Sequence, residues 1–227
     1  MSTLFVVPTP IGNLEDITLR AIRALKEVDL IYAEDTRTTK KLLDHFQIKN
    51  QLASNHIHNE HKTLAQKIDR IKSLNAVALV SDAGTPGISD PGYLLINECY
   101  KHAINVICLP GPTAFVPALV GSGFPTDSFL FVGFLPHKKG RKTLWLKLAC
   151  ETRTIVLYES PHRIEKFLKE FQENIGNERK LCVVREISKI HEQFIRGTVE
   201  ELIAHFKSTQ PKGEMVVVIE PMKPKKT

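Results

Sequence analysis

Three short segments rich in glycine and proline each follow an apolar run: residues 8–13, 81–92 and 110–114. The preceding runs show no polar alternation, which is typical of strands buried on both faces of a parallel sheet. Loops at the carboxyl ends of parallel strands share one edge, and such sheets bind their ligands there. We therefore expect these three loops to gather at one edge and to bind a small molecule.

The segment 81–92, SDAGTPGISDPG, is the most distinctive, because three glycines and two prolines in one loop indicate backbone held close to a ligand. The segment 8–13, PTPIGN, is no GxGxxG fingerprint, and its prolines remove donors that a pyrophosphate needs. A stiff strand-to-helix turn is the alternative interpretation for that segment. Asp82 and Asp90 lack further clustered ligands, so no metal site is predicted.

Strand-like and helical segments alternate along the chain, which predicts an α/β fold. In the first half, the expected strands are 4–7, 30–33, 76–80 and 105–109. The expected helices there are 37–46, 63–74 and 93–102, together with one capped by Asn13 and carrying an apolar stripe from Ile17 to Val28.

In the second half, the expected strands are 129–133, 154–158, 181–185, 193–196 and 215–219, and the expected helices are 143–149, 163–175 and 198–206. Turn-forming residues at 121–128 suggest a domain boundary. We predict a mostly parallel N-terminal domain with helices on both faces (1–122), a smaller mixed C-terminal α/β domain (123–222) and a basic tail (223–227).

The composition indicates a soluble globular protein, because the 227 residues are 42% hydrophobic and 25% charged. No apolar run approaches the roughly 20 residues that span a bilayer, and the N-terminus resembles no signal peptide. A cytoplasmic protein without membrane association is therefore expected. The four cysteines stand far apart and are predicted to be reduced core residues. The net charge of +6 has the sign that phosphate backbones attract.

Nine segments together resemble the tetrapyrrole methylase superfamily. They are VPTPIGNLEDIT, AEDTRTT, HNE, VSDAGTPGISDPG, LPGPTA, GFLP, YESPHR, Arg185-Glu186 and KGEMV, and they extend from residue 7 to residue 216. Within the superfamily, the sequence is most similar to the branch of small-subunit (16S) ribosomal RNA cytidine 2′-O-methyltransferases. The resemblance implies S-adenosylmethionine as the cofactor, a cofactor cleft between two α/β domains, and a homodimer.

The resemblance also implies which residues bind the cofactor. They are Pro8, Asp82, Ala83, Gly84, Gly87, Thr113, Ala114, Phe131 and Gly213. A sulfonium and an amino acid end need carboxylate and carbonyl acceptors, and Asp82 could serve that need or merely cap its own loop.

Methyl transfer to a ribose hydroxyl calls for a proton acceptor. The candidates are Glu34 and Asp35, then His56, His58 and Glu60, and finally Glu159 and His162. Glu34 and Asp35 follow the strand 30–33 and should lie at the edge of the cofactor loops. A helix cap is the alternative role for Asp35 and for Glu60. The sequence alone singles out no base.

Basic residues after AEDT and in the PHKKGRK segment favour RNA as the substrate. The predicted RNA-binding residues are Arg37, Lys138, Lys139, Arg141 and Arg163, with Lys40, Lys41, His137 and Lys142 beside them. The expected partner is small-subunit ribosomal RNA or the assembled small subunit. A methylase of a small tetrapyrrole or corrinoid, and a non-catalytic RNA-binding assembly factor, are the alternatives.

Overall fold

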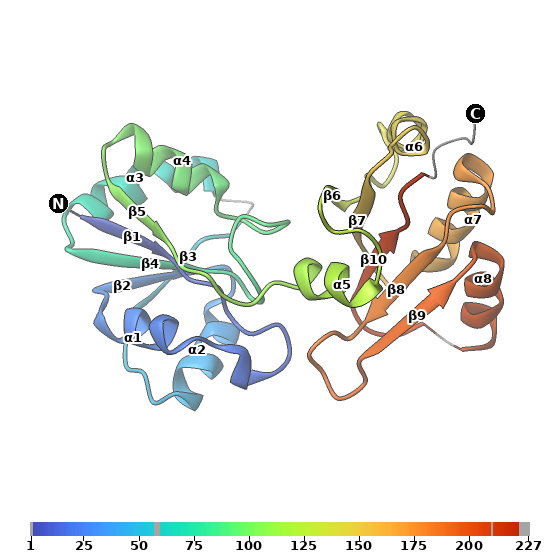
Figure 1. Cartoon of the computed structure of the whole chain (residues 1–227). Coiled ribbons are helices and arrows are strands. Elements are labelled where there is room, and N and C mark those ends of the chain that lie inside the picture. The colour runs from blue at the N-terminus through green and yellow to red at the C-terminus, as the bar shows by residue number, and fades with distance from the viewer. Residues whose placement is uncertain (1, 57–59, 210, 223–227) are drawn as a thin grey trace. The chain divides into compact units, whose positions relative to one another are not determined.

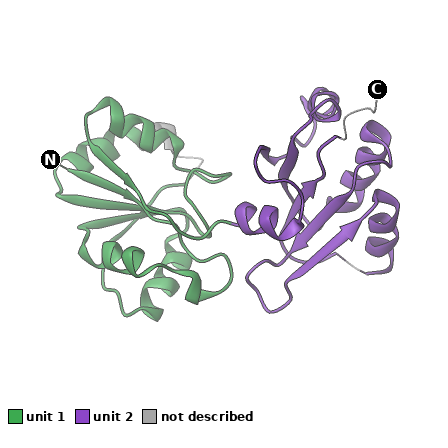
Figure 2. Ribbon diagram, in the orientation of Figure 1, with its two compact units in different colours: residues 1–113 green, residues 114–227 purple. Residues whose placement is uncertain are grey.

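A computed structural model describes residues 2–56, 60–209 and 211–222, with side chains omitted at 60–62. The chain forms two compact units, residues 1–113 and 114–227, which are nearly equal in length (Figure 2). The second unit is therefore not the smaller one that we predicted. The predicted basic tail, 223–227, lies outside the described residues.

The first unit is built on a five-stranded sheet in the order β3-β2-β4-β1-β5, and every neighbouring pair is parallel. The strands are β1 (Thr3–Val6), β2 (Leu30–Ala33), β3 (Leu52–Ser54), β4 (Ala76–Val80) and β5 (Asn105–Cys108). All the strands predicted in this half are present, and the short β3 was not predicted.

Helices cover both faces of the first sheet, as the sequence predicted (Figure 1). Helices α1 (Leu19–Glu27) and α2 (Thr36–His45) pack on one face, and α3 (Glu60–Lys72) and α4 (Tyr93–Lys101) pack on the other. The carboxyl ends of the strands remain free to carry loops.

The first helical segment begins differently from our prediction. Asn13 caps a short 3-10 helix, η1 (Leu14–Asp16), by accepting a hydrogen bond from the Glu15 amide. Thr18 caps α1 itself by accepting from the Ala21 amide. The predicted single helix is therefore split, because each of these side chains satisfies the amides of its own helix start.

The second unit is built on a mixed sheet in the order β6-β7-β10-β8-β9, in which β6 and β7 are parallel and the other pairs antiparallel. The strands are β6 (Phe129–Phe134), β7 (Thr154–Glu159), β8 (Leu181–Arg185), β9 (Gln193–Gly197) and β10 (Met215–Ile219). This mixed sheet agrees with the prediction.

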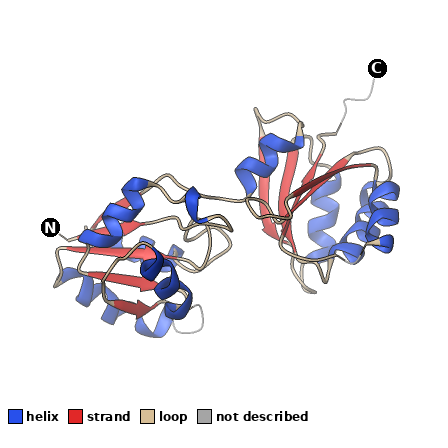
Figure 3. Ribbon diagram, turned by 90° about the horizontal axis from the view of Figure 1, so that it is seen from below, coloured by secondary structure: helices blue, strands red, loops and turns tan. Residues whose placement is uncertain are grey.

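Helices lie against the second sheet as well (Figure 3). Helices α6 (Arg141–Ala149), α7 (Ile164–Ile175) and α8 (Val199–Ser208) bury one face, and α5 (Phe115–Ser122) packs on the other through Ala118 and Leu119. The division between units therefore precedes α5, whereas we placed the boundary after residue 122.

Two of the four cysteines are core residues, as predicted, and two are not. Cys99 and Cys182 are buried, and burial raises the pKa of each thiol to about 11. Cys108 and Cys150 are exposed, which differs from the prediction. Cys108 ends β5, which lies at the sheet edge and is not buried on both faces as expected.

Along the described ranges, the helices are too short or too polar to cross a membrane. The same ranges contain no group of three His, Cys, Asp or Glu side chains placed to hold a metal ion.

Candidate active site

The three glycine- and proline-rich loops meet at one edge of the first sheet, which confirms the predicted convergence. Thr9 and Gly84 exchange two backbone hydrogen bonds of 2.9 Å, so the loops after β1 and β4 pair directly. The Thr85 hydroxyl donates to the Pro112 carbonyl at 3.1 Å, which joins the loop after β5. Strand direction brings the loops together, and these bonds fix them.

The glycines of the central loop are needed for backbone conformation. Gly84 has φ +78° and Gly87 has φ +85°, both in the left-handed region that glycine adopts without steric cost. A Cβ on Gly84 would lie 3.5 Å from the Ile11 side chain, an ordinary contact. The left-handed φ is therefore one reason for glycine at Gly84, and the close approach of this backbone to a ligand stays a prediction.

Three carboxylates at the same edge form a connected group, which we call the acidic cluster: Glu34, Asp35 and Asp82. The Asp82 carboxylate accepts the Asp35 amide at 3.0 Å, and the Asp82 amide approaches the Glu34 carboxylate at 3.4 Å. Asp82 thus ties the end of β4 to the end of β2. The alternative that Asp82 merely caps its own loop is not what the structure shows.

Glu34 and Asp35 have opposite electrostatic environments. Burial raises the pKa of Glu34 above its ordinary value; the hydrogen bond from the Asp82 amide opposes that shift, and the Asp82 charge adds to it. Hydrogen bonds from the Arg37 side chain hold the pKa of Asp35 far below its usual range. Asp35 also caps α2 by accepting the Arg37 amide. Glu34 is therefore the better proton acceptor of the two.

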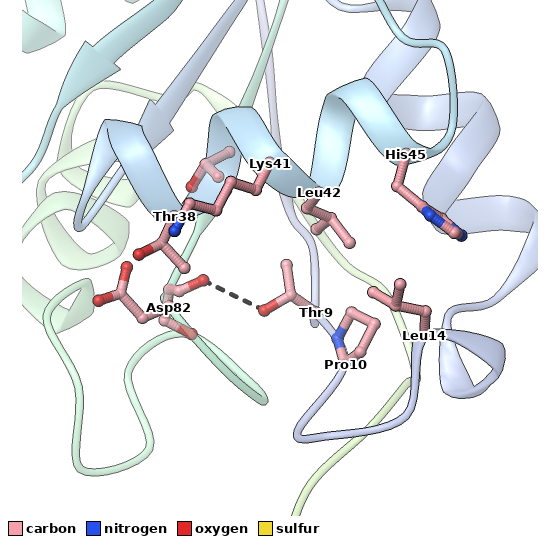
Figure 4. A pocket seen from close by; sticks show the side chains of 10 residues that line it. Thr9, Pro10, Leu14, Thr38, Lys41, Leu42, His45 and Asp82 are labelled. Carbon is pink, nitrogen blue, oxygen red and sulfur yellow. Dashed lines mark hydrogen bonds between the residues drawn. The ribbon is translucent and has the colours of Figure 1, made fainter.

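A pocket of about 330 Å³ opens beside the acidic cluster, between α2 and the loop after β1. Figure 4 shows Thr38, Leu42 and His45 along α2 facing Thr9, Pro10 and Leu14, and the Thr9 hydroxyl donates to the Ser81 carbonyl at 3.1 Å. The remaining residues that line the pocket are Thr39, Lys41, Ser81 and Asp82. Volumes of this size hold small ligands.

The sequence reasoning missed Leu14, Thr38, Leu42 and His45 as pocket residues. The available signal was the position of α2, because a helix that starts at a strand-end loop turns one side toward that loop. Lys41, which we named only for RNA, also lines the pocket.

The remaining proton-acceptor candidates come from other segments. His56 is exposed, and its charge acts on Glu34, where it opposes the rise in the pKa of that carboxyl. Glu60 begins α3, and its side chain lies outside the described residues, as does all of His58. Glu159 belongs to the second unit, where its side chain is fully buried and paired with Arg163. His162 is exposed in the same unit.

The implied cofactor residues of the second unit have contacts of their own. Phe131 stacks on Phe115 with ring centres 4.5 Å apart. Gly213 has φ +79°, and a Cβ there would lie within 2.4 Å of the Glu186 side chain. The matched segments Arg185-Glu186 and KGEMV meet in this way, because the Glu186 carboxylate also accepts the Glu214 amide at 3.1 Å.

The predicted RNA-binding residues fall into two groups. Lys138 and Lys139 are exposed, and the Arg37 side chain is 87% exposed although it pairs with Asp35. Arg141 is buried, bonded to the Pro136 carbonyl at 3.0 Å and to the Glu170 carboxylate at 2.7 Å. Arg141 is therefore a structural residue, which corrects the prediction that it binds RNA.

The family model described as Tetrapyrrole (Corrin/Porphyrin) Methylases matches residues 3–203, and the chain therefore belongs to that family. This confirms the resemblance found in the sequence.

Within the family, the chain is 51% identical to a protein of Synechocystis named Ribosomal RNA small subunit methyltransferase I, over 96% of this chain and 79% of that one. The protein of the same name from Thermotoga maritima is 48% identical, over 96% and 98% of the two chains. The fold is similar to that of a uroporphyrin-III C-methyltransferase from Thermus thermophilus solved with S-adenosylhomocysteine. That structure has 18% identity and a TM-score of 0.64 over 95% of this chain and 96% of that one.

Proposed function

We propose that the protein transfers a methyl group from S-adenosylmethionine to the 2′-hydroxyl of a cytidine in small-subunit ribosomal RNA. The relatives' names support the RNA substrate, and the sequence resemblance supports the cytidine and the ribose hydroxyl. The observation that carries the proposal is the edge of the first sheet, where three loops are hydrogen-bonded to one another and the Asp82 amide of one of them lies 3.4 Å from the Glu34 carboxylate, whose pKa is raised.

The chemistry of the donor groups at this edge suits S-adenosylmethionine. Asp82 is exposed and acidic, and the loop beside it offers backbone carbonyls to an amino acid end. The residues proposed to hold the cofactor are Pro8, Asp82, Ala83, Gly84, Gly87, Thr113, Ala114, Phe131 and Gly213. When bound, the cofactor supplies an electrophilic methyl group on a positive sulfonium.

The protein's own residues would position the acceptor and remove its proton. A ribose hydroxyl is a weak nucleophile until its proton is accepted, and the raised pKa of Glu34 suits it to that task. Asp82 positions Asp35 and, through it, the start of α2. The pocket beside them offers Thr38 and Lys41 as donors for a nucleotide.

A small tetrapyrrole is the second candidate substrate, because the solved neighbour acts on a uroporphyrin. Lys138 and Lys139, both exposed, favour RNA over it. We also propose, from the sequence resemblance, that the enzyme works in the cytoplasm as a homodimer.

Transfer of tritiated methyl groups tests the proposal. Intact small subunits, extracted ribosomal RNA, a short oligonucleotide and a corrinoid precursor are compared at equal salt, and the product nucleoside is identified after nuclease digestion. The expected product is 2′-O-methylcytidine, with the highest rate on intact subunits. Transfer only to the corrinoid would overturn the RNA substrate, and binding of RNA without any transfer would favour the assembly factor.

A further inference from the structure

The parallel pair β6 and β7 brings a second set of strand ends together, in the second unit. Phe134 ends β6 and pairs in register with Tyr158, one residue before Glu159 ends β7. The GFLP and YESPHR segments are therefore neighbours, for the same topological reason that gathers the loops of the first sheet (Figure 1).

Phe134 is an exposed aromatic side chain at this edge, with 51% of its surface open. Its ring packs against the ring of Tyr158 on the neighbouring strand, with the two ring centres 5.5 Å apart. The Arg163 guanidinium lies over the Phe134 ring at 5.8 Å. The ring and the guanidinium together present flat groups at the surface.

Arg163 is held in place from beneath by a buried carboxylate. Its Nε lies 2.9 Å from Glu159 Oε1, and the Glu159 side chain is fully buried. The same oxygen accepts the Ser160 amide at 2.8 Å, while Oε2 has no hydrogen-bond partner among the described residues. A buried carboxylate needs a paired cation, so Glu159 fixes the guanidinium and Arg163 compensates the charge.

The surroundings indicate the kind of partner. The Arg163 Nη1 lies 3.3 Å from a ring nitrogen of His137, and the exposed Lys138 and Lys139 follow in the chain. The charge of Arg163 is already compensated by Glu159. Among the described residues, neither Lys138 nor Lys139 forms an ion pair. Flat groups beside unpaired cations match an unpaired base and its phosphates.

We propose that Phe134 and Arg163 form a platform on which an unpaired base of the RNA substrate stacks, with Lys138 and Lys139 binding the adjoining phosphates. Glu159, a candidate base from the sequence, is then a positioning residue that orients Arg163. This inference rests on the proposed function, because it assigns a binding site for the same RNA.

Binding of a single-stranded RNA that carries 2-aminopurine tests the platform, because stacking quenches the fluorescence of that base. Phe134→Leu should weaken binding by about 5- to 150-fold, the range for losing one stacked base. Phe134→Trp should restore binding and quenching. Phe129→Leu, on the same strand and 36% exposed, is the matched control and should bind as the parent does.

Two further variants test the geometry of the guanidinium. Arg163→Lys keeps the charge but loses the flat group, so quenching at saturating RNA should fall. Glu159→Gln should reduce quenching in the same way, a readout that a purely structural role would not move. The thermal transition of this variant should stay cooperative.

Measurements on the parent protein show whether the proposed function or only the platform is wrong. If it binds S-adenosylmethionine but neither binds nor methylates RNA, the proposed function fails. If it methylates RNA and Phe134→Leu matches it in affinity and quenching, the platform alone is overturned.

Discussion

The first sheet gathers its site through strand direction and backbone hydrogen bonds, whereas the second sheet builds an exposed surface from side chains. Thr9 and Gly84 pair backbone to backbone. By contrast, the Arg163 guanidinium contacts the Phe134 ring and is paired with the buried Glu159 carboxylate, so side chains make these contacts. The first arrangement is set largely by topology, and the second depends on each side chain, so substitutions should affect the two regions differently.

The largest expected effect is on the stability of the second unit. Arg141→Ala removes a buried guanidinium bonded to Glu170 and to the Pro136 carbonyl, while Glu170 keeps Trp145 and Lys166, so the free energy of unfolding should fall by about 2–3 kcal/mol. Chemical denaturation measures it. Lys142→Ala, an exposed neighbour on α6, should change stability little, and equal losses in the two variants would contradict a structural role for Arg141.

Gly84→Ala tests the backbone origin of the first site. The left-handed φ should cost about 1–2 kcal/mol of stability, and because Gly84 pairs with Thr9, cofactor affinity should fall by about tenfold or more. Gly123→Ala has a similar φ of +76° with nothing near its Cβ, so it carries the same backbone cost away from these loops. Calorimetric titration with S-adenosylmethionine should show weaker binding for Gly84→Ala only. Normal binding by that variant would remove this loop from the cofactor site.

The raised pKa of Glu34 predicts a pH signature. Methyl transfer needs the ionised carboxylate, so the rate should fall on the acid side at a pH above the ordinary glutamate pKa of about 4.3. A glutamate whose pKa is raised by folding stabilises the protein below its unfolded pKa and loses that contribution as pH rises. Glu34→Gln should therefore melt at an equal or higher temperature at neutral pH, and a marked loss of stability would contradict the raised pKa.

The smallest expected effect concerns the exposed lysines. Changing Lys138 and Lys139 to Gln should make the dependence of log affinity for RNA on log salt shallower by about 1.4 for single-stranded RNA. Fluorescence titrations at several salt concentrations measure this slope, and cofactor affinity should not change. An unaltered slope would place the phosphate contacts elsewhere.

Most of the fold was predictable because short apolar runs such as 30–33 and 76–80 alternate with helical patterns, as strands of a parallel sheet do. Helix α5 was missed because its sequence, FVPALVGS, is apolar on every side and shows no helical period. The convergence of the loops followed from the direction of parallel strands.

The roles of individual charged residues were less predictable. Glu34 and Asp35 are adjacent in sequence, and their pKa values shift in opposite directions because Glu34 is partly buried whereas Asp35 is hydrogen-bonded to Arg37. Arg141 lies among loop cations in the sequence, but Glu170, distant along the chain, accounts for its burial. Such differences arise from tertiary contacts that spacing does not encode.

The most direct test measures kcat and KM for methyl transfer to small ribosomal subunits in Glu34→Gln and Phe134→Leu. The account predicts that Glu34→Gln lowers kcat by about 100-fold or more with little change in KM for RNA, since it removes a proton acceptor. Phe134→Leu should raise KM for RNA and leave kcat near that of the parent. A parental kcat in Glu34→Gln, or the same change of one parameter in both variants, would contradict the assignment of the proton acceptor to the first sheet and of the base-stacking platform to the second.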